Sequence, residues 1–249
     1  MVTSDEPIPA ATLVVWNDRP NGPEILVVER SARMAFAAGA IVFPGGRVDP
    51  TDRAIAEAFG RPDEAAKVTA IRETIEETGV AAAVLGLKYE RLGLELQQAL
   101  HEGANFAELL SNHGLQLNLD SLTAFARWMP AFKQPRKFDT LFYLASAPVG
   151  NWHPNPQESE CVSAEWASPA SLLERIDRGE ANAIFPTKRN LERLAQHRTL
   201  ESALTDARNH SIETIIPWVE DIDGAPHVRI PEGRGYPVIS EPLATAFRA

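Results

Sequence analysis

The sequence predicts an α/β protein, and two features carry this prediction. Two short apolar runs rich in valine and leucine, residues 10–16 and 24–29, have the length of buried strands. A longer segment, residues 62–78, has apolar side chains at the i, i+3, i+7 spacing of one helical face. Gly79 follows it directly and is a typical helix stop. Short strands and an amphipathic helix therefore alternate along the first third of the chain.

Composition limits the class of protein. With 249 residues and 44% hydrophobic content, the chain is long enough to bury a sizeable core, and one elaborated domain is expected over residues 8–230. A formal net charge of −10 argues against a nucleic-acid partner, because phosphate backbones require a basic face. No apolar run is long enough for a membrane span, and no targeting pattern opens the chain, which predicts a cytoplasmic protein. Cys161, the only cysteine, is expected to be a buried small side chain.

The first elements can be predicted in chain order. The two apolar runs are expected to be strands joined by the polar turn at residues 17–23. Residues 30–39 form a loop, and residues 40–43 form a brief strand before two glycines. Gly45 and Gly46 form either a tight turn or a point where the backbone closely approaches a metal or a phosphate.

The segments further along the chain continue the α/β pattern. Residues 54–59, stopped by Gly60, predict a short helix that covers part of the site. The later segments predict a strand at 81–89, two helical pieces within 95–114, strands at 122–130 and 138–145, helices beginning at Ser168 and near Pro186, and a terminal hairpin around Asp223 and Gly224.

Three glutamates lie on one face of the long helix. At 100° per residue, Glu73, Glu76 and Glu77 fall within roughly 100° of one another. Clustered negative charges repel one another and cost stability unless a cation lies among them. Mg²⁺ or Mn²⁺, which prefer oxygen ligands, would be the natural cofactor. The alternative is an ordinary solvated glutamate face.

The sequence around these glutamates resembles the Nudix box. Residues 72–80, Arg-Glu-Thr-Ile-Glu-Glu-Thr-Gly-Val, match its half R-E-U-x-E-E-x-G-U, where U is apolar and only Thr74 departs. Gly46, within Phe-Pro-Gly-Gly, matches the opening glycine of the box. The chain is identified as a member of the Nudix hydrolases on these residues.

The match is interrupted between its two halves. Glu64 keeps the family's E-x7-R spacing to Arg72, but seventeen residues separate it from Gly46 where the family has five. Asp52 keeps the family's spacing from Gly46, so about twelve residues are inserted between Asp52 and Glu64. We expect Glu64 to form a supporting ion pair with Arg72.

The resemblance implies an α/β/α sandwich with a mixed β-sheet over residues 10–178, helical insertions, and a C-terminal extension over residues 179–249. It also implies metal-dependent hydrolysis of a diphosphate linkage, with Arg72 orienting Glu73. The implied metal ligands are Glu73, Glu76 and Glu77, with the Gly46 carbonyl and Glu160 as additions.

Glu160 is implied by its spacing. Nudix proteins often place a glutamate six residues before a tryptophan at the start of the last core strand, where it reaches the metals or acts as a base. Glu160 has this spacing to Trp166, and Glu158 is its competitor. An exposed structural glutamate is the alternative interpretation.

Residues 26–46 resemble the signature of the coenzyme A diphosphatase subgroup, L-L-T-x-R-(S/A)-x3-R-x3-G-x3-F-P-G-G. Arg30, Ser31 and Gly39 match, whereas the second arginine is Ala35, with Arg33 two residues away. The insertion in the box is also similar to the peroxisomal branch found in animals. Coenzyme A or acyl-coenzyme A is thereby the implied substrate, cleaved to 3′,5′-ADP and (acyl-)4′-phosphopantetheine. The alternative is that the two arginines are ordinary loop cations.

Other substrate contacts and functions are left open by the residues. Gly45 and Gly46 would contact the substrate, and a helix start with Lys188 and Arg189 is a candidate phosphate site or only a capped surface helix. The alternative functions are a diphosphatase acting on ADP-ribose, nucleotide sugars or dinucleotides, and a module that senses a nucleotide without cleaving it. The expected partner is a small nucleotide-derived molecule, without nucleic acid or membrane, and a homodimer stays open.

Overall fold

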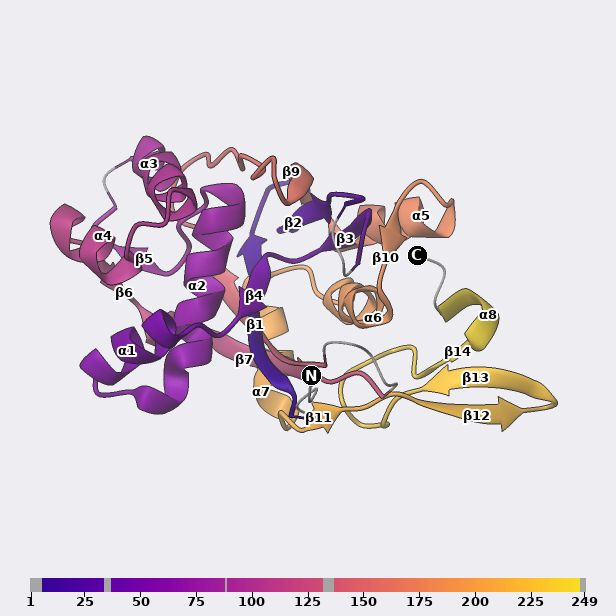
Figure 1. Ribbon diagram of the computed structural model, residues 1–249. Coiled ribbons are helices and arrows are strands. Elements are labelled where there is room, and N and C mark those ends of the chain that lie inside the picture. Colours follow the sequence, from indigo (N-terminus) through magenta and orange to yellow (C-terminus); the bar gives the residue numbers. More distant parts are fainter. Residues whose placement is uncertain (1–5, 34–36, 88, 132–136, 247–249) are drawn as a thin grey trace.

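A mixed β-sheet runs through the centre of the protein (Figure 1). The computed structural model describes residues 6–33, 37–87, 89–131 and 137–246. The strands of this sheet are β1 (Ile8–Asn17), β2 (Glu24–Arg30), β3 (Ala40–Val42), β4 (Gly45–Arg47), β7 (Thr123–Trp128), β8 (Phe138–Ser146), β9 (Cys161–Ala167), β10 (Asn182–Ala183) and β11 (Thr214–Ile215). Their order is β10-β3-β2-β1-β8-β7-β11, with β4 paired to β1 and β9 paired to β2.

The central strand β1 is buried on both faces. It runs parallel to β8, from the pair Ile8 and Phe138 to the pair Trp16 and Ser146. Its side chains alternate between two separate cores, because successive residues of a strand point to opposite faces. Leu13 belongs to one core and Val14 to the other. Burial on both faces explains why this strand is an uninterrupted apolar run in the sequence.

Helices cover both faces of the sheet, so the implied α/β/α layering is confirmed (Figure 1). The first core is formed with α1 (Pro50–Ala58), α2 (Ala65–Thr78), α3 (Glu90–His101) and α4 (Phe106–His113). The second core is formed with α5 (Pro169–Asp177), α6 (Phe185–Leu194) and α7 (Leu200–Asn209). The short remaining helices are η1 (Pro62–Glu64), η2 (Leu119–Ser121) and α8 (Leu243–Ala246).

Several boundaries differ from the sequence prediction. The helix expected over 62–78 begins with the 3-10 turn η1, continues as α2, and ends at Gly79 with a left-handed φ of 70°. The short inserted helix begins one turn earlier than expected, at Pro50, a residue that favours the first helical position. The strand expected over 81–89 is reduced to β5 (Val84–Leu85), which pairs with β6 (Gln116–Leu117). Ala83 and Gly86, both with positive φ, bend the backbone on either side of β5.

The end of the chain forms a second, three-stranded sheet. It contains β12 (Trp218–Ile222), β13 (Ala225–Arg229) and β14 (Ser240–Pro242), and the predicted hairpin around Asp223 and Gly224 is confirmed. The hairpin extends away from the central sheet in Figure 1. Val228, Ile230 and Tyr236 nevertheless belong to the second core, so the extension packs on the sheet.

Helix α3 lies unusually close to the end of α2. A Cβ atom at Gly93 of α3 would lie 2.2 Å from the carbonyl oxygen of Gly79 and 2.7 Å from the ring of Trp152. Real Cβ atoms do not approach that closely, and one of the two neighbours is backbone. Glycine at position 93 therefore sets the distance between the two helices.

We expect Gly93→Ala to destabilise the protein, although alanine is the better helix former by about 1 kcal/mol. The added methyl group meets backbone that cannot move aside, and overpacking of this kind costs about 1–3 kcal/mol. Urea unfolding measures the change, and Glu95→Ala on the exposed side of α3 is the matched control, expected within about 0.5 kcal/mol of the wild type. A more stable Gly93→Ala protein would contradict this packing.

Candidate active site

The three glutamates of α2 lie at the edge of the first core. The opposite side of the helix is fully buried through Val68, Ile71 and Ile75, as the apolar spacing predicts. Exposed fractions of the glutamate side chains are 3% for Glu77, 15% for Glu73 and 33% for Glu76. The three side chains therefore range from buried to one-third exposed. They do not form the freely solvated face of the alternative interpretation.

Thr74, the departure from the box pattern, is accommodated inside the helix. Its side chain is fully buried, and its hydroxyl donates to the carbonyl oxygen of Ala70 over 2.7 Å. A threonine hydroxyl that bonds back to residue i−4 needs no other partner in an apolar surrounding. The polar residue at an apolar position thus leaves the core intact.

Strand β4 holds the two glycines against the glutamates. The N–H of Gly45 donates to Glu77 over 3.1 Å. A Cβ atom at Gly46 would lie 2.4 Å from Oε1 of Glu73, and one at Gly45 would lie 2.5 Å from the carbonyl oxygen of Ala11. The tight-turn interpretation is wrong, because the pair is extended backbone paired to β1. Close approach to its neighbours is what requires glycine at these two positions.

Arg72 is the cation at the centre of the carboxylates. Its Nε and Nη2 atoms lie 2.8 and 2.9 Å from the two carboxylate oxygens of Asp52. Its Nη1 atom lies 3.0 Å from both Glu73 and Glu76. Burial opposes the charge of Arg72, but the hydrogen bonds to Asp52 and the surrounding negative charges outweigh it, so its pKa is raised. Arg72 therefore stays charged and fixes the positions of its partners.

Asp52, and not Glu64, is the partner that the inserted segment supplies. Asp52 is fully buried and also accepts from the Thr69 hydroxyl over 2.8 Å. The expected Glu64–Arg72 pair is wrong, since Glu64 lies beside Arg61 and Lys67. Glu64 lies in the 3-10 turn before α2, where these two cations hold it, and the nitrogens of Arg72 are taken by Asp52, Glu73 and Glu76. The spacing of Asp52 from Gly46 was the sequence signal for this role.

Burial raises the pKa of two of the glutamates. Loss of solvent raises the pKa of Glu73 to about 7, against the lowering effect of Arg72. Burial, and then the charge of Glu73, raise the pKa of Glu77 well above its ordinary value, although Arg30 and the N–H of Gly45 counteract them. The nearby guanidinium groups of Arg72 and Arg30 do not offset the desolvation of these two carboxylates, so a further cation beside them would favour their charged forms.

Arg30 reaches the glutamate face from the sheet, and the strand pairing brings Glu160 next to Arg30. Arg30, at the end of β2, places Nη1 3.9 Å from Oε1 of Glu77. It pairs across the sheet with Cys161, the first residue of β9, and Glu160 directly precedes that residue. Glu160 is exposed, and its charge contributes to the raised pKa of Glu77. The predicted residues of both segments are thus brought next to α2.

Cys161 lies beneath these side chains and is buried, as expected. Burial and the charge of Glu77 raise the pKa of its thiol to about 12. A thiol with this pKa is protonated at neutral pH, and only the thiolate is a nucleophile. Cys161 is therefore not a candidate nucleophile of this site.

Two of the predicted substrate contacts belong to α6, which packs in the second core. Lys188 and Arg189 of α6 both pair with Glu241 over 2.9 Å, and Arg189, with 1% of its side chain exposed, also lies 2.6 Å from Glu192. Arg33 is exposed on the loop after β2, and Ala35 lies outside the described residues. Ion pairs with Glu241 of β14 and Glu192 of α6 therefore engage the positive charges of Lys188 and Arg189.

The donor chemistry of the glutamate face fits a divalent metal ion. Glu73, Glu76 and Glu77 offer carboxylate oxygens, which Mg²⁺ and Mn²⁺ prefer. Within the described ranges, no three carboxylate, imidazole or thiol side chains already converge as a metal site. The reason is visible in the distances, because Glu73 and Glu76 are both turned to Arg72. Arg72 contacts one oxygen of each carboxylate, Oε1 of Glu73 and Oε2 of Glu76, so a metal ion at this face would have the second oxygen of each as a donor.

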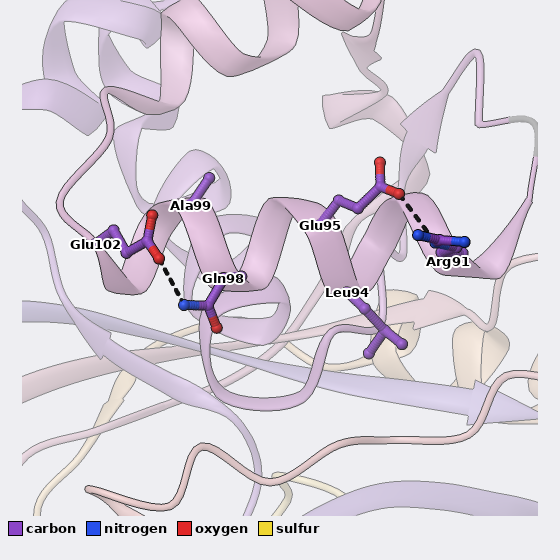
Figure 2. Close-up of a pocket in the computed structure, with 6 residues that line it drawn as sticks. All are labelled: Arg91, Leu94, Glu95, Gln98, Ala99 and Glu102. Carbon is purple, nitrogen blue, oxygen red and sulfur yellow. Dashed lines mark hydrogen bonds and ion pairs between the residues drawn. The ribbon is translucent and has the colours of Figure 1, made fainter.

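A shallow depression on the outer side of α3 is separate from this site. It encloses about 400 Å³ and is lined by Arg91, Leu94, Glu95, Gln98, Ala99 and Glu102 (Figure 2). Its ion pairs and hydrogen bonds join residues of the same helix, Arg91 with Glu95 and Gln98 with Glu102. None of the predicted site residues lines it.

The family model of the NUDIX domain matches residues 6–186, about three quarters of the chain. The chain belongs to the Nudix hydrolase family, whose members hydrolyse phosphorus-containing acid anhydrides and generally use divalent metal ions. No helix in the part of the chain that the structure describes is long and apolar enough to cross a membrane.

Two named proteins and one solved structure are similar to this chain over most of its length. The chain is 24% identical to the acyl-coenzyme A diphosphatase NUDT19 of Gallus gallus, over 80% of this chain and 69% of that protein. It is 23% identical to the protein of the same name from Xenopus laevis, over 82% and 69%. A solved structure of a NUDIX hydrolase from Alicyclobacillus acidocaldarius is 31% identical, with a TM-score of 0.70, and the match covers 81% of this chain and 97% of that one.

Asp52→Ala is expected to lower the free energy of unfolding by about 3–5 kcal/mol, because it leaves the buried guanidinium of Arg72 without its bidentate partner. Glu64→Ala, which removes a partly solvated ion pair, is the matched control and should cost about 1 kcal/mol or less. Urea denaturation of both variants checks the assignment. Equal losses would mean that Asp52 has no special role.

Proposed function

We propose that this protein is a metal-dependent diphosphatase that cleaves coenzyme A or acyl-coenzyme A to 3′,5′-ADP and 4′-phosphopantetheine or its acyl derivative. The observation that carries this proposal is the position of Arg30, the arginine of the coenzyme A-like signature, beside the buried Glu77. The two relatives named acyl-coenzyme A diphosphatase, which match at least 80% of the chain, support the same substrate class.

The side chains divide the work by their charge and burial. Arg30, whose side chain is mostly buried next to Glu77, would bind a diphosphate oxygen. Its planar guanidinium suits bidentate contact with phosphate. Arg72 would hold Glu73 and Glu76 at the spacing that its own pairing with Asp52 fixes. Gly45 and Gly46 let strand β4 lie directly against Glu73 and β1, which would keep the Gly46 carbonyl close to the glutamate face.

A divalent metal ion is part of the proposal. Glu73, Glu76 and Glu77 would hold it, with the Gly46 carbonyl and Glu160 as additional donors. When bound, such an ion offsets the charge of diphosphate oxygens and lowers the pKa of water, which is the chemistry that attack on phosphorus requires. A carboxylate oxygen of the chain would accept the proton of the attacking water. Which glutamate does so differs among Nudix families.

A substrate panel tests the proposed function. Coenzyme A, acyl-coenzyme A, ADP-ribose, NADH and diadenosine polyphosphates are incubated with the protein and Mg²⁺ or Mn²⁺, and the products are identified by mass. We expect release of 3′,5′-ADP together with 4′-phosphopantetheine from the first two compounds. If only one of the other compounds is cleaved, the proposed substrate is wrong and that compound is assigned instead. If no compound is cleaved but one of them raises the melting temperature of the protein, the protein is a sensing module.

Glu76→Gln is the control within the same panel. Replacing Glu76 by the neutral amide removes a proposed metal ligand and should abolish turnover. The protein should stay folded, because Glu76 is the most exposed of the three glutamates. Circular dichroism verifies the fold. Full activity in this variant would refute the assignment of the glutamate face.

Mg²⁺ or Mn²⁺ is expected to raise the melting temperature of the wild type. A ligand at 100 times its dissociation constant stabilises the folded state by about 2.7 kcal/mol, which corresponds to about 5–10 °C for a chain of this length. Differential scanning fluorimetry with and without a chelator measures the shift. Glu73→Gln should reduce it, whereas Glu64→Gln, outside the glutamate face, should retain it. An equal shift in both variants would place metal binding elsewhere.

A further inference from the structure

Two segments outside the Nudix box bind the C-terminal carbonyl groups of α2. A helix leaves its last four carbonyl groups without partners inside the helix. In this protein all four are satisfied within hydrogen-bond distance. The pairs are Ile75 with the N–H of Gly79 (2.8 Å), Glu76 with Nε2 of Gln97 (3.2 Å), Glu77 with the N–H of Gln157 (3.1 Å), and Thr78 with the N–H of Asn155 (2.8 Å).

Gln97 of α3 joins these segments to one another. Its side-chain amide also donates to the carbonyl oxygen of Asn155 over 2.8 Å and accepts from Nδ2 of Asn155 over 2.9 Å. Only 5% of the residue is exposed. One buried amide therefore connects α2, α3 and the loop that precedes β9. Buried hydrogen bonds of this kind are costly to leave unmade, so the three segments are held at fixed distances.

The loop carries this arrangement to Glu160. The N–H groups of Glu160 and Cys161 both donate to the carbonyl oxygen of Gln157, over 3.0 and 2.7 Å. The carbonyl oxygen of Glu160 accepts from the N–H of Ser31 over 2.8 Å. Residues 155–160 thus run as one hydrogen-bonded segment from the end of α2 to the strand next to Arg30. A shift of Asn155 would be transmitted to Glu160.

We propose that Gln97 is a positioning residue of the reaction, and that it acts by holding residues 155–160, and with them the carboxylate of Glu160, at the glutamate face. This proposal rests on the proposed function and extends it, because it assigns a role in the site to a helix that lies outside the box. A purely structural glutamine would stabilise the fold without any energetic connection to Glu160.

Gln97→Met tests the proposal, because methionine keeps the length of the side chain and removes all three hydrogen bonds. We expect kcat for the fastest-cleaved panel compound to fall about 10–100-fold, the effect of a small misplacement of a reacting group, with little change in KM. The matched control is Gln98→Met. Gln98 is exposed on the outer side of α3, bonded only to Glu102 (Figure 2), and its replacement should leave kcat unchanged.

A double-mutant cycle with Glu160→Gln separates positioning from general destabilisation. If Gln97 acts through Glu160, Gln97→Met should cost less than about threefold in kcat when Glu160 is already replaced. The same loss in both backgrounds would overturn the proposal, and so would Glu160→Gln with the kcat of the wild type. In both of these outcomes the wild type still hydrolyses its substrate, and the proposed function stands.

Hydrogen exchange of the metal-free protein gives a readout that needs no activity. The amides of Asn155 and Gln157 should exchange about tenfold faster in Gln97→Met than in the wild type, and Gln98→Met should leave them unchanged. Unchanged exchange in Gln97→Met would overturn the positioning role. A wild type that cleaves no compound of the panel would instead refute the proposed function, and the exchange rates would still decide whether Gln97 holds the loop.

Discussion

The buried contact between Arg72 and Asp52 is the interaction on which the site depends. Arg72 is removed from solvent and therefore needs negative partners, and Asp52 satisfies two of its nitrogens while Glu73 and Glu76 share the third. Desolvation of a guanidinium is compensated only by good geometry of this kind. Because Asp52 belongs to α1 and Arg72 to α2, the same contact fixes the inserted helix on the sheet and orders the glutamate face.

The site is assembled from four segments that are distant in sequence. The glutamates come from α2, the glycines from β4, Arg30 from β2 and Glu160 from the loop before β9. Pairing of β2 with β9 and of β1 with β4 brings three of these segments to one region of the sheet, and α2 packs over it. The chemistry therefore depends on the register of the central sheet as much as on the residues of the box.

Much of this arrangement follows from the sequence alone. The strands at residues 10–16 and 24–29, the helix ending at Gly79 and its glutamate face follow from periodicity, because burial imposes a fixed spacing on apolar residues. The spacing to Arg72 could not identify its partner, since Glu64 keeps the family spacing and yet pairs with Arg61 and Lys67. Only the folded insertion brings Asp52 into contact.

Other features left no trace that local reasoning could use. Gln97 is one of two adjacent glutamines on an amphipathic helix, and its burial between α2 and residue 155 is what gives it a role. Lys188 and Arg189 show the opposite case, because a basic helix start is a good phosphate-site pattern until a distant carboxylate occupies it. Glu241 lies more than fifty residues away, beyond the range of any local motif.

The C-terminal extension forms part of the second core, although most of it lies outside the family match. The family model ends at residue 186, yet Leu191, Ala203, Val228 and Ile230 lie beyond it and pack in the core that holds Val14 and Trp16 of the central strand. The residues that the family model matches and the residues that bury this face of the sheet are therefore not the same set. Truncation of the chain at the end of the family match would therefore expose the apolar face of β1 that lies opposite the glutamate layer.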